Sequence, residues 1–253
     1  MQGYNAGFAR IYNQRWAWFA ERLAPKIAAL YAARATCDPA LPILDLACGT
    51  GQMARHFAAA GYRTLGVDLS AAMLRHARQN CADYTTNGTL QFVQADMSGL
   101  PLAGKFGLVV STYDAVNHLP DGAALARLFT AVADQLAPGG MFVFDMNTRA
   151  GLVGWGTVNV QELPDLFLVM RGVFAADDNR ATMQITGFVR DNSGGGWQRV
   201  DETAYNTIFP MATVAQLLRD AGFSRMYAAA LDDLTTAVAD PEAISRVCWV
   251  VQR

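Results

Sequence analysis

The stretch LDLACGTGQMARHF, residues 44–57, joins a run of apolar residues to a helical pattern through a turn that contains two glycines. PILDLA (42–47) is short and apolar, as expected for a buried strand, and MARHFAAAG (53–61) has the periodicity of a short helix closed by Gly61. A glycine-rich turn between a buried strand and a helix lets a ligand approach the backbone closely. Several unrelated ligands bind at such turns, so the rest of the chain must identify this one.

Strand and helix patterns continue to alternate as far as residue 147. A helix capped by Ser70 carries Met73, Leu74 and Ala77 on one face, and a second helix over Leu125–Leu136 is expected to end at PGG (138–140). The other strand-like segments are YRTLGVDLS (62–70), LQFVQAD (90–96), FGLVVSTYD (106–114), MFVFDMN (141–147), FSRMYAAAL (223–231) and RVCWVVQR (246–253). Such alternation predicts an α/β fold with a doubly wound, mostly parallel sheet of seven strands.

Two segments do not follow this alternation. Residues 148–209 contain β-type runs that predict an antiparallel β insertion after the fifth strand, serving as a substrate cover or an oligomer contact. Residues 1–40 predict an N-terminal helical lid, with Tyr4, Phe8, Ile11 and Tyr12 on one helical face. The main domain would then comprise residues 41–147 and 210–253. Exposed hairpin edges could pair two subunits in a homodimer.

The composition restricts the classes of partner. The net charge is −2 and the sequence has no run of basic residues, which disfavours nucleic acid and an anionic membrane surface. No stretch approaches the ~20 apolar residues of a membrane helix and the start lacks a signal-peptide pattern, so we expect a cytoplasmic protein. The four cysteines form no CxxC pair and the three histidines show no ligand spacing, so we expect no metal.

Ligands of open parallel sheets bind beyond the carboxyl ends of the strands, where Asp45–Gly51 is expected to lie. Asp68 ends the second strand 19 residues after Gly49, close to the spacing at which a carboxylate accepts from ribose hydroxyls. A nicotinamide dinucleotide would satisfy both features, since Gly49-x-Gly51-x-x-Ala54 is a permissible variant of its fingerprint. Asp45, however, would repel a pyrophosphate and suits a ligand that carries an amine.

Five motifs together resemble those of class I S-adenosylmethionine-dependent methyltransferases. They are ILDLACGTG, GVDLS, QADM, FGLVVSTYDAVNHL and LAPGGMFVFDMN, in the order and spacing of that family, and ATVAQLLRDAGF resembles the helix before its last two strands. The resemblance covers roughly residues 41–147 and 210–253, and it implies a Rossmann-like methyltransferase fold with S-adenosyl-L-methionine as cofactor. STYD departs from the NPPY-type motif that holds an extruded base in DNA-amine methyltransferases.

The resemblance also implies roles for individual residues in cofactor binding. Gly49 and Gly51 would lie against the methionine part of the cofactor with Asp45 near its ammonium group, and Asp68 would accept from the ribose hydroxyls. Leu69 and Met73 would pack on the adenine, while Asp96 and the backbone of Met97 would bind its edge. Tyr113 would lie near the sulfonium. The complete set of predicted cofactor-binding residues is Asp45, Ala47, Gly49, Gly51, Asp68, Leu69, Met73, Asp96, Met97 and Tyr113.

Methyl transfer from a sulfonium is an in-line displacement that needs alignment in a dry pocket and no covalent nucleophile. Tyr113 and His118 are the catalytic candidates, His118 as a base for the acceptor's proton, with Asp114 and Asn117 as competitors. For the small-molecule acceptor we predict contacts from Tyr12, Asn147, Trp155 and Arg171. The place of the insertion is similar to that in small-molecule N-methyltransferases, including those that act on nucleotide-linked aminosugars.

The sequence predicts an enzyme that methylates nitrogen or oxygen of a small molecule, and two other functions remain open. One is a non-catalytic S-adenosylmethionine-binding or partner subunit, because this chemistry requires no obligatory base. The other is a nicotinamide-dependent oxidoreductase.

Overall fold

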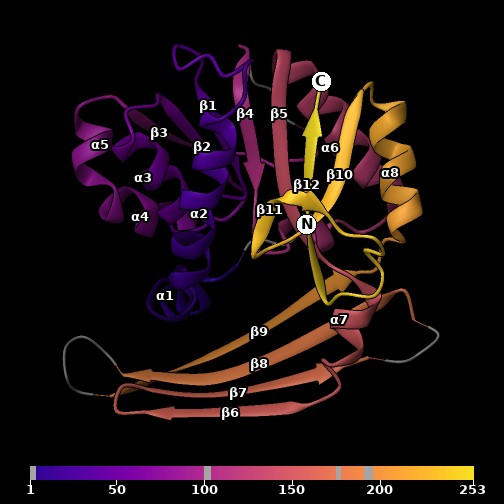
Figure 1. The fold of residues 1–253 in the computed structure, drawn as a ribbon. Helices are drawn as coiled ribbons and strands as arrows, with labels where there is room; N and C mark the ends of the chain where they lie inside the picture. Colours follow the sequence, from indigo (N-terminus) through magenta and orange to yellow (C-terminus); the bar gives the residue numbers. More distant parts are fainter. Residues whose placement is uncertain (1–3, 100–103, 175–177, 191–195) are drawn as a thin grey trace.

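A computed structural model describes residues 4–99, 104–174, 178–190 and 196–253, and these residues form two β-sheets (Figure 1). The larger sheet has eight strands in the order β11-β10-β12-β5-β4-β1-β2-β3. Their bounds are β1 (Ile43–Leu46), β2 (Thr64–Asp68), β3 (Leu90–Gln94), β4 (Phe106–Ser111), β5 (Leu136–Asn147), β10 (Arg225–Ala230), β11 (Asp233–Ala237) and β12 (Arg246–Gln252). Seven of these strands coincide with the predicted segments. The eighth, β11, is a short edge strand that pairs with β10 in an irregular register and has no apolar run to reveal it.

The pairing of β1 with two neighbours determines where a ligand can bind. β1 is parallel to both β2 and β4, and the chain runs outward through β2 and β3 before it returns to β4. The order of strands therefore reverses between β1 and β4, which is where open α/β sheets bind ligands. β12 is antiparallel to β5, and β10 and β11 follow it to the other edge of the sheet.

Helices cover both faces of the larger sheet. One face holds α2 (Ala17–Ala32), α3 (Gln52–Ala59), α4 (Ala71–Asn80) and α5 (Ala82–Thr86); the other holds α6 (Gly122–Gln135) and α8 (Met211–Asp220). Side chains along β5 alternate between these layers. Phe142 and Phe144 pack among α6 residues, whereas Met141 and Val143 pack against α2. The doubly wound architecture predicted from the sequence is confirmed.

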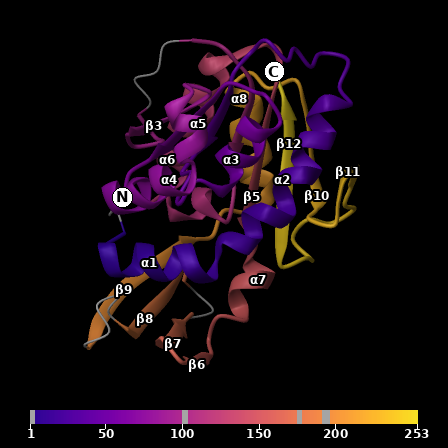
Figure 2. The same ribbon diagram turned by 90° about the vertical axis from the view of Figure 1, so that its left-hand side faces the viewer.

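The second sheet contains β6 (Val158–Leu163), β7 (Leu166–Val173), β8 (Arg180–Arg190) and β9 (Trp197–Thr207), all antiparallel. β6 was not anticipated, because the three apolar residues of its sequence VNVQEL are separated by polar ones and form no continuous apolar run. The sheet lies beneath the carboxyl ends of the parallel strands (Figure 1). Its inner face packs against α1 (Ala6–Arg15) through Ile11, Leu168 and Ile185, and α1 lies between this sheet and α4 (Figure 2). The predicted lid begins at residue 1, and its first three residues lie outside the described residues.

Helix caps and turns follow the sequence with one exception. Ser70 caps α4 by accepting a hydrogen bond from the backbone N–H of Met73, as predicted. The expectation that PGG separates a helix from a strand was wrong, since α6 ends at Gln135 and β5 already includes these residues. The first residue of β5, Leu136, already pairs with Phe106 on β4, and the register then shifts to pass the PGG turn. A short α7 (Arg149–Val153) and a 3-10 turn, η1 (Ala115–His118), complete the elements used below.

Within the described ranges, no helix has both the length and the apolar character required to cross a membrane.

Candidate functional site

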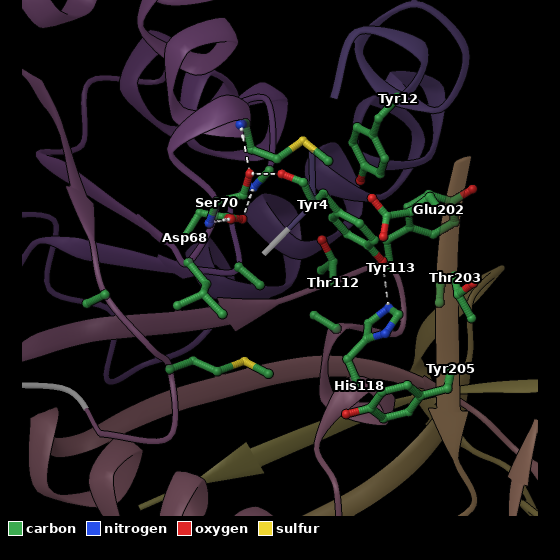
Figure 3. Close-up of a pocket in the computed structure, with 18 residues that line it drawn as sticks. Tyr4, Tyr12, Asp68, Ser70, Thr112, Tyr113, His118, Glu202, Thr203 and Tyr205 are labelled. Carbon is green, nitrogen blue, oxygen red and sulfur yellow. Dashed lines mark hydrogen bonds between the residues drawn. The ribbon is translucent and has the colours of Figure 1, made fainter. Parts of the chain in front are cut away.

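A cavity opens at the carboxyl ends of the central strands, and α1 and β9 close it from the opposite side (Figure 3). It lies at the predicted point where the strand order reverses. The predicted residues that line it are Tyr12, Ala47, Gly49, Asp68, Leu69, Met73, Met97, Tyr113 and His118. The unpredicted ones are Tyr4, Ser70, Ala95, Thr112, Ala115, Glu202, Thr203, Ala204 and Tyr205.

The glycine turn and the end of β2 are joined by the carboxylate of Asp68. Its Oδ2 accepts from the backbone N–H of Gly49 at 2.8 Å, and its Oδ1 accepts from that of Ser70 at 2.8 Å. Gly49 has φ +55°, a left-handed conformation, and a Cβ there would lie 3.4 Å from the Tyr12 ring. Burial raises the pKa of Asp68, while the hydrogen bonds from Ser70 and Gly49 lower it. Asp68 lines the cavity, and the remaining lone pairs of its carboxylate can accept hydrogen bonds from hydroxyl groups of a ligand.

Asp45 lies outside the cavity lining, buried at the end of β1. It is 1% exposed, and its Oδ2 has no hydrogen-bond partner among the described residues. Burial raises the pKa of Asp45 to about 8, against a lowering by the backbone of Ala54 and a smaller increase from Asp68. A buried acceptor without a partner is costly, and a cationic group that reached it would relieve that cost. This orphaned oxygen fits a cofactor that carries an ammonium group.

One wall of the cavity is apolar. Leu69, Met73, Ala95 and Met97 come from the segments that follow β2 and β3, and they line the same space as Asp68. Met73 and Met97 are buried, so their side chains form a fixed surface. The adenosine part of S-adenosylmethionine has a flat, weakly polar ring attached to a ribose. That ring would fit against this wall if Asp68 held the ribose.

Besides Asp45, two more of the predicted cofactor residues do not line the cavity. Gly51 precedes α3 with φ +89°, and a Cβ there would meet Cys81 Sγ at 3.0 Å and Phe92 Cζ at 3.1 Å. Its glycine is therefore explained by close packing behind the turn. Asp96 accepts from the backbone N–H and the hydroxyl of Ser98, at 2.8 and 2.7 Å, and so holds its own loop.

The opposite end of the cavity is polar and contains His118. The His118 Nε2 lies 3.2 Å from the Tyr4 hydroxyl and 3.9 Å from Asp114 Oδ2. Burial lowers the pKa of His118 although Asp114 raises it, and burial raises the pKa of Tyr4. Both groups are thus held neutral near pH 7, with the imidazole able to accept a proton. Asn117, a competing candidate, is buried and instead donates to the carbonyls of Asn147 and Thr207.

Glu202 brings a carboxylate to this polar end from β9 (Figure 3). Its Oε2 accepts from the side-chain amide of Asn5 at 2.8 Å and from its backbone N–H at 3.2 Å. Asn5 is also the N-cap of α1, so Glu202 fixes the start of that helix over the cavity. Among the described residues, the lining includes no lysine or arginine.

Tyr113 lies at the junction of the two ends, just after β4. Its ring stacks on Phe19 of α2 with centroids 4.5 Å apart, and lies 6.0 Å from the ring of Tyr12. Burial raises the pKa of Tyr113 to about 12, with a further increase from Asp114. The phenol is therefore un-ionised at neutral pH and offers a fixed aromatic surface.

Three residues predicted to contact the acceptor lie elsewhere. Asn147 is buried in a polar network with Asn206 and Arg246. Trp155 packs with Leu152 of α7, and Arg171 is exposed on β7. Only Tyr12 of that predicted set lines the cavity.

Sequence reasoning missed Tyr4 and the β9 residues of the cavity for a spatial reason. Tyr4 was predicted on the aromatic face of a helix, which was wrong, because α1 begins at Ala6 with Asn5 as its cap. The Tyr4 carbonyl accepts from the Ser70 hydroxyl at 2.8 Å, and its ring reaches His118. Glu202 and Tyr205 lie in a strand whose pattern predicts a hairpin but not which surface the hairpin covers. No local signal in the sequence could have placed that strand next to η1.

Comparison with known proteins agrees with this geometry. Residues 43–140 match the family model described as a methyltransferase domain. The dTDP-3-amino-3,4,6-trideoxy-alpha-D-glucopyranose N,N-dimethyltransferase of Streptomyces venezuelae is 30% identical over 198 residues, which cover 77% of this chain and 80% of that protein.

Solved structures agree in fold. An S-adenosylmethionine-dependent methyltransferase from Clostridium acetobutylicum superposes with a TM-score of 0.81 at 24% identity, covering 97% of both chains. A sugar N-methyltransferase from a Streptoalloteichus species gives 0.76 at 22% identity, covering 100% of this chain and 94% of the other. The motifs, the sheet order and these matches together show that the chain belongs to the class I S-adenosylmethionine-dependent methyltransferases.

Proposed function

We propose that the cavity holds S-adenosylmethionine at its Asp68 end and a small hydroxylated amine at its Glu202 end, and that the enzyme methylates the amine nitrogen. The observation that carries this proposal is the acidic character of the acceptor end. Glu202 is the carboxylate there, His118 and the tyrosines are neutral, and the described lining contains no lysine or arginine. An ammonium group would be attracted to such a surface, whereas a carboxylate or a phosphate would be repelled.

The cofactor assignments rest on the contacts around Asp68. Its carboxylate would accept from the ribose hydroxyls, Gly49 would lie against the methionine part, and Asp45 would face the ammonium group. Leu69, Met73, Met97 and Ala47 would enclose the adenosine. Gly51 and Asp96 would support this site from outside the cavity, Gly51 by close packing and Asp96 by holding the loop after β3.

When bound, S-adenosylmethionine supplies an electrophilic methyl group on a sulfonium. Tyr113 and Tyr12 would exclude water from the transfer region and align the acceptor, which in this chemistry provides much of the acceleration. An amine attacks only when it is neutral, so a proton must leave it. The His118 imidazole, kept neutral by burial and bonded to the Tyr4 hydroxyl, is placed to accept that proton.

The relatives support an amine acceptor. The Streptomyces venezuelae protein is an N,N-dimethyltransferase of a dTDP-linked aminosugar. A second relative, the dTDP-3-amino-3,6-dideoxy-alpha-D-glucopyranose N,N-dimethyltransferase of Streptomyces fradiae, is 32% identical over 47% of this chain. Of the features of these acceptors, we extend to this chain only the amine and the hydroxyl groups close to it. The lining of its cavity, as far as the chain is described, offers no lysine or arginine to bind a diphosphate.

The test is a turnover assay with S-adenosylmethionine and matched acceptors: a hydroxylated primary amine, the same molecule with a hydroxyl in place of the amine, and a nucleotide-linked aminosugar. We expect methylated amine and an equal amount of S-adenosylhomocysteine. Glu202→Gln should raise KM for the amine, while Glu162→Gln, an exposed position on β6, should not. Methylation of the alcohol in preference to the amine would contradict the proposal.

We further propose that two subunits associate through the outer face of the second sheet, where Val158, Val160, Val173, Phe188 and Trp197 are exposed. Among the described strands, β6 is at the edge of that sheet and pairs on one side only, with β7. Light scattering should give the mass of a dimer for the wild type and of a monomer for Val160→Lys; a monomeric wild type would contradict this. A cytoplasmic location stays a prediction.

A further inference from the structure

Arg246, the first residue of β12, bridges three side chains with its guanidinium. Its Nη2 lies 2.5 Å from Asp114 Oδ1, its Nη1 2.8 Å from Asp145 Oδ2, and its Nε 3.0 Å from Asn147 Oδ1. The side chain of Arg246 is 17% exposed, and that of Asp145 is fully buried. The three partners come from the turn after β4 and from the end of β5, so the guanidinium joins three neighbouring strands of the sheet.

The same network holds the backbone of the turn that carries Tyr113. Asp145 Oδ1 accepts from the Tyr113 N–H at 2.5 Å, and its Oδ2 accepts from the Asp114 N–H at 3.1 Å. Tyr113 and Asp114 have φ +65° and +52°, a left-handed conformation that costs energy for residues with a Cβ. Two consecutive residues of this kind persist only when surrounding contacts hold them.

Arg246 also touches the ring of Tyr113. Its guanidinium carbon lies 5.3 Å from the Tyr113 ring centroid and 4.9 Å from that of Phe19, and these two rings stack on each other. Burial lowers the pKa of Arg246, but Asp114 and Asp145 together raise it by more than burial lowers it, so the guanidinium stays charged. Arg246 therefore holds the backbone of Tyr113 through Asp145 and contacts the Tyr113 ring directly.

We infer that Arg246 is a positioning residue that keeps Tyr113 in the cofactor cavity and so determines the affinity for S-adenosylmethionine. This inference rests on the proposed placement of Tyr113 beside the sulfonium. Without the guanidinium, the carboxylates of Asp114 and Asp145 face each other unpaired, the left-handed turn loses its support, and the ring leaves its place. Arg246 itself does not line the cavity, so its effect must pass through Tyr113.

A double-mutant cycle tests this coupling. Calorimetry would measure the affinity for S-adenosylhomocysteine in the wild type, Arg246→Gln, Tyr113→Ala and the double variant. We expect each single variant to bind about 10-fold more weakly, and the double variant to bind no more weakly than the weaker single one. Arg253→Gln is the matched control. Arg253 donates to the Leu136 carbonyl at 2.7 Å at the far end of β12, and its loss should leave the affinity unchanged.

Each outcome decides the inference. If the two losses multiply in the double variant, Arg246 acts independently of Tyr113 and the inference is overturned, while the proposed function stands. If Tyr113→Ala binds as tightly as the wild type, both the inference and the proposed place of Tyr113 are wrong. If Arg246→Gln does not fold, Arg246→Lys replaces it in the cycle, because a lysine keeps the buried charge but cannot bridge both aspartates.

Discussion

Cofactor binding is expected to release a proton from Asp45. Burial raises the pKa of this carboxyl to about 8, and its Oδ2 has no hydrogen-bond partner in the described part of the chain. With a pKa of about 8, about nine-tenths of the Asp45 carboxyls carry a proton at pH 7. The ammonium group of the ligand favours the ionised form, and an opposite charge at close range lowers a carboxyl pKa by about 1 to 3 units.

The size of the release follows from these values. If the pKa falls from about 8 to between about 5 and 7, binding at pH 7 releases about 0.4 to 0.9 protons. These values also give the direction in which the affinity for the ligand changes with pH. Affinity must rise with pH below the pKa of the free protein, and S-adenosylhomocysteine should bind about 2- to 8-fold more tightly at pH 7 than at pH 6.

The assay is calorimetric titration with S-adenosylhomocysteine in several buffers of different ionisation enthalpy at pH 7. The slope of the observed enthalpy against that ionisation enthalpy is the number of protons released. Asp45→Asn is nearly isosteric and cannot ionise, so its slope should fall to near zero and its affinity should lose the pH dependence. A flat line for the wild type, or an unchanged slope in Asp45→Asn, would refute the link between Asp45 and the ammonium group.

Three further predictions concern stability and turnover. Ser70→Ala removes the cap of α4 and the bond to the Tyr4 carbonyl, and should lower the free energy of unfolding in urea by about 1 kcal/mol; no change would show that neither bond stabilises the fold. Phe144→Ala empties a fully buried site among the rings of Phe129, Phe142 and Trp249, and should cost about 3 to 5 kcal/mol by the same measurement; a cost below that of Ser70→Ala would contradict the packing. His118→Gln should lower kcat for the amine about 100-fold. In the wild type, kcat should decline at acidic pH, beginning below pH 6.5 because burial lowers the pKa of His118, and the variant should lose this decline. An unchanged pH profile would exclude the proton-accepting role.

The sequence was sufficient for the parts of the fold that depend on local patterns. A buried strand, a glycine turn and a helix are contiguous in residues 44–57, and Asp68 lies one strand later, so their mutual placement follows from the parallel sheet itself. Gly49 and Asp68 accordingly meet through a direct hydrogen bond. Ser70 was recognisable as a cap because capping involves residues only three positions apart.

The acceptor end could not be predicted in the same way. Tyr4, His118 and Glu202 are far apart in sequence, and they meet only because α1 and β9 both fold over the end of η1. Trp155 and Arg171 were chosen by residue type, and type alone does not say which face of an antiparallel strand meets the cavity. The network of Arg246 with Asp114 and Asp145 was missed for the same reason, since strand order and not sequence separation brings its members together.

The most direct test of the central claim is a crystal structure of the protein with S-adenosylhomocysteine. We expect ribose hydroxyls within hydrogen-bond distance of the Asp68 carboxylate and the adenine against Met73 and Met97. The ligand's sulfur should face Tyr113 and the polar end that contains His118 and Glu202. A ligand bound away from the glycine turn, or one whose ribose does not touch Asp68, would contradict the proposed cofactor site.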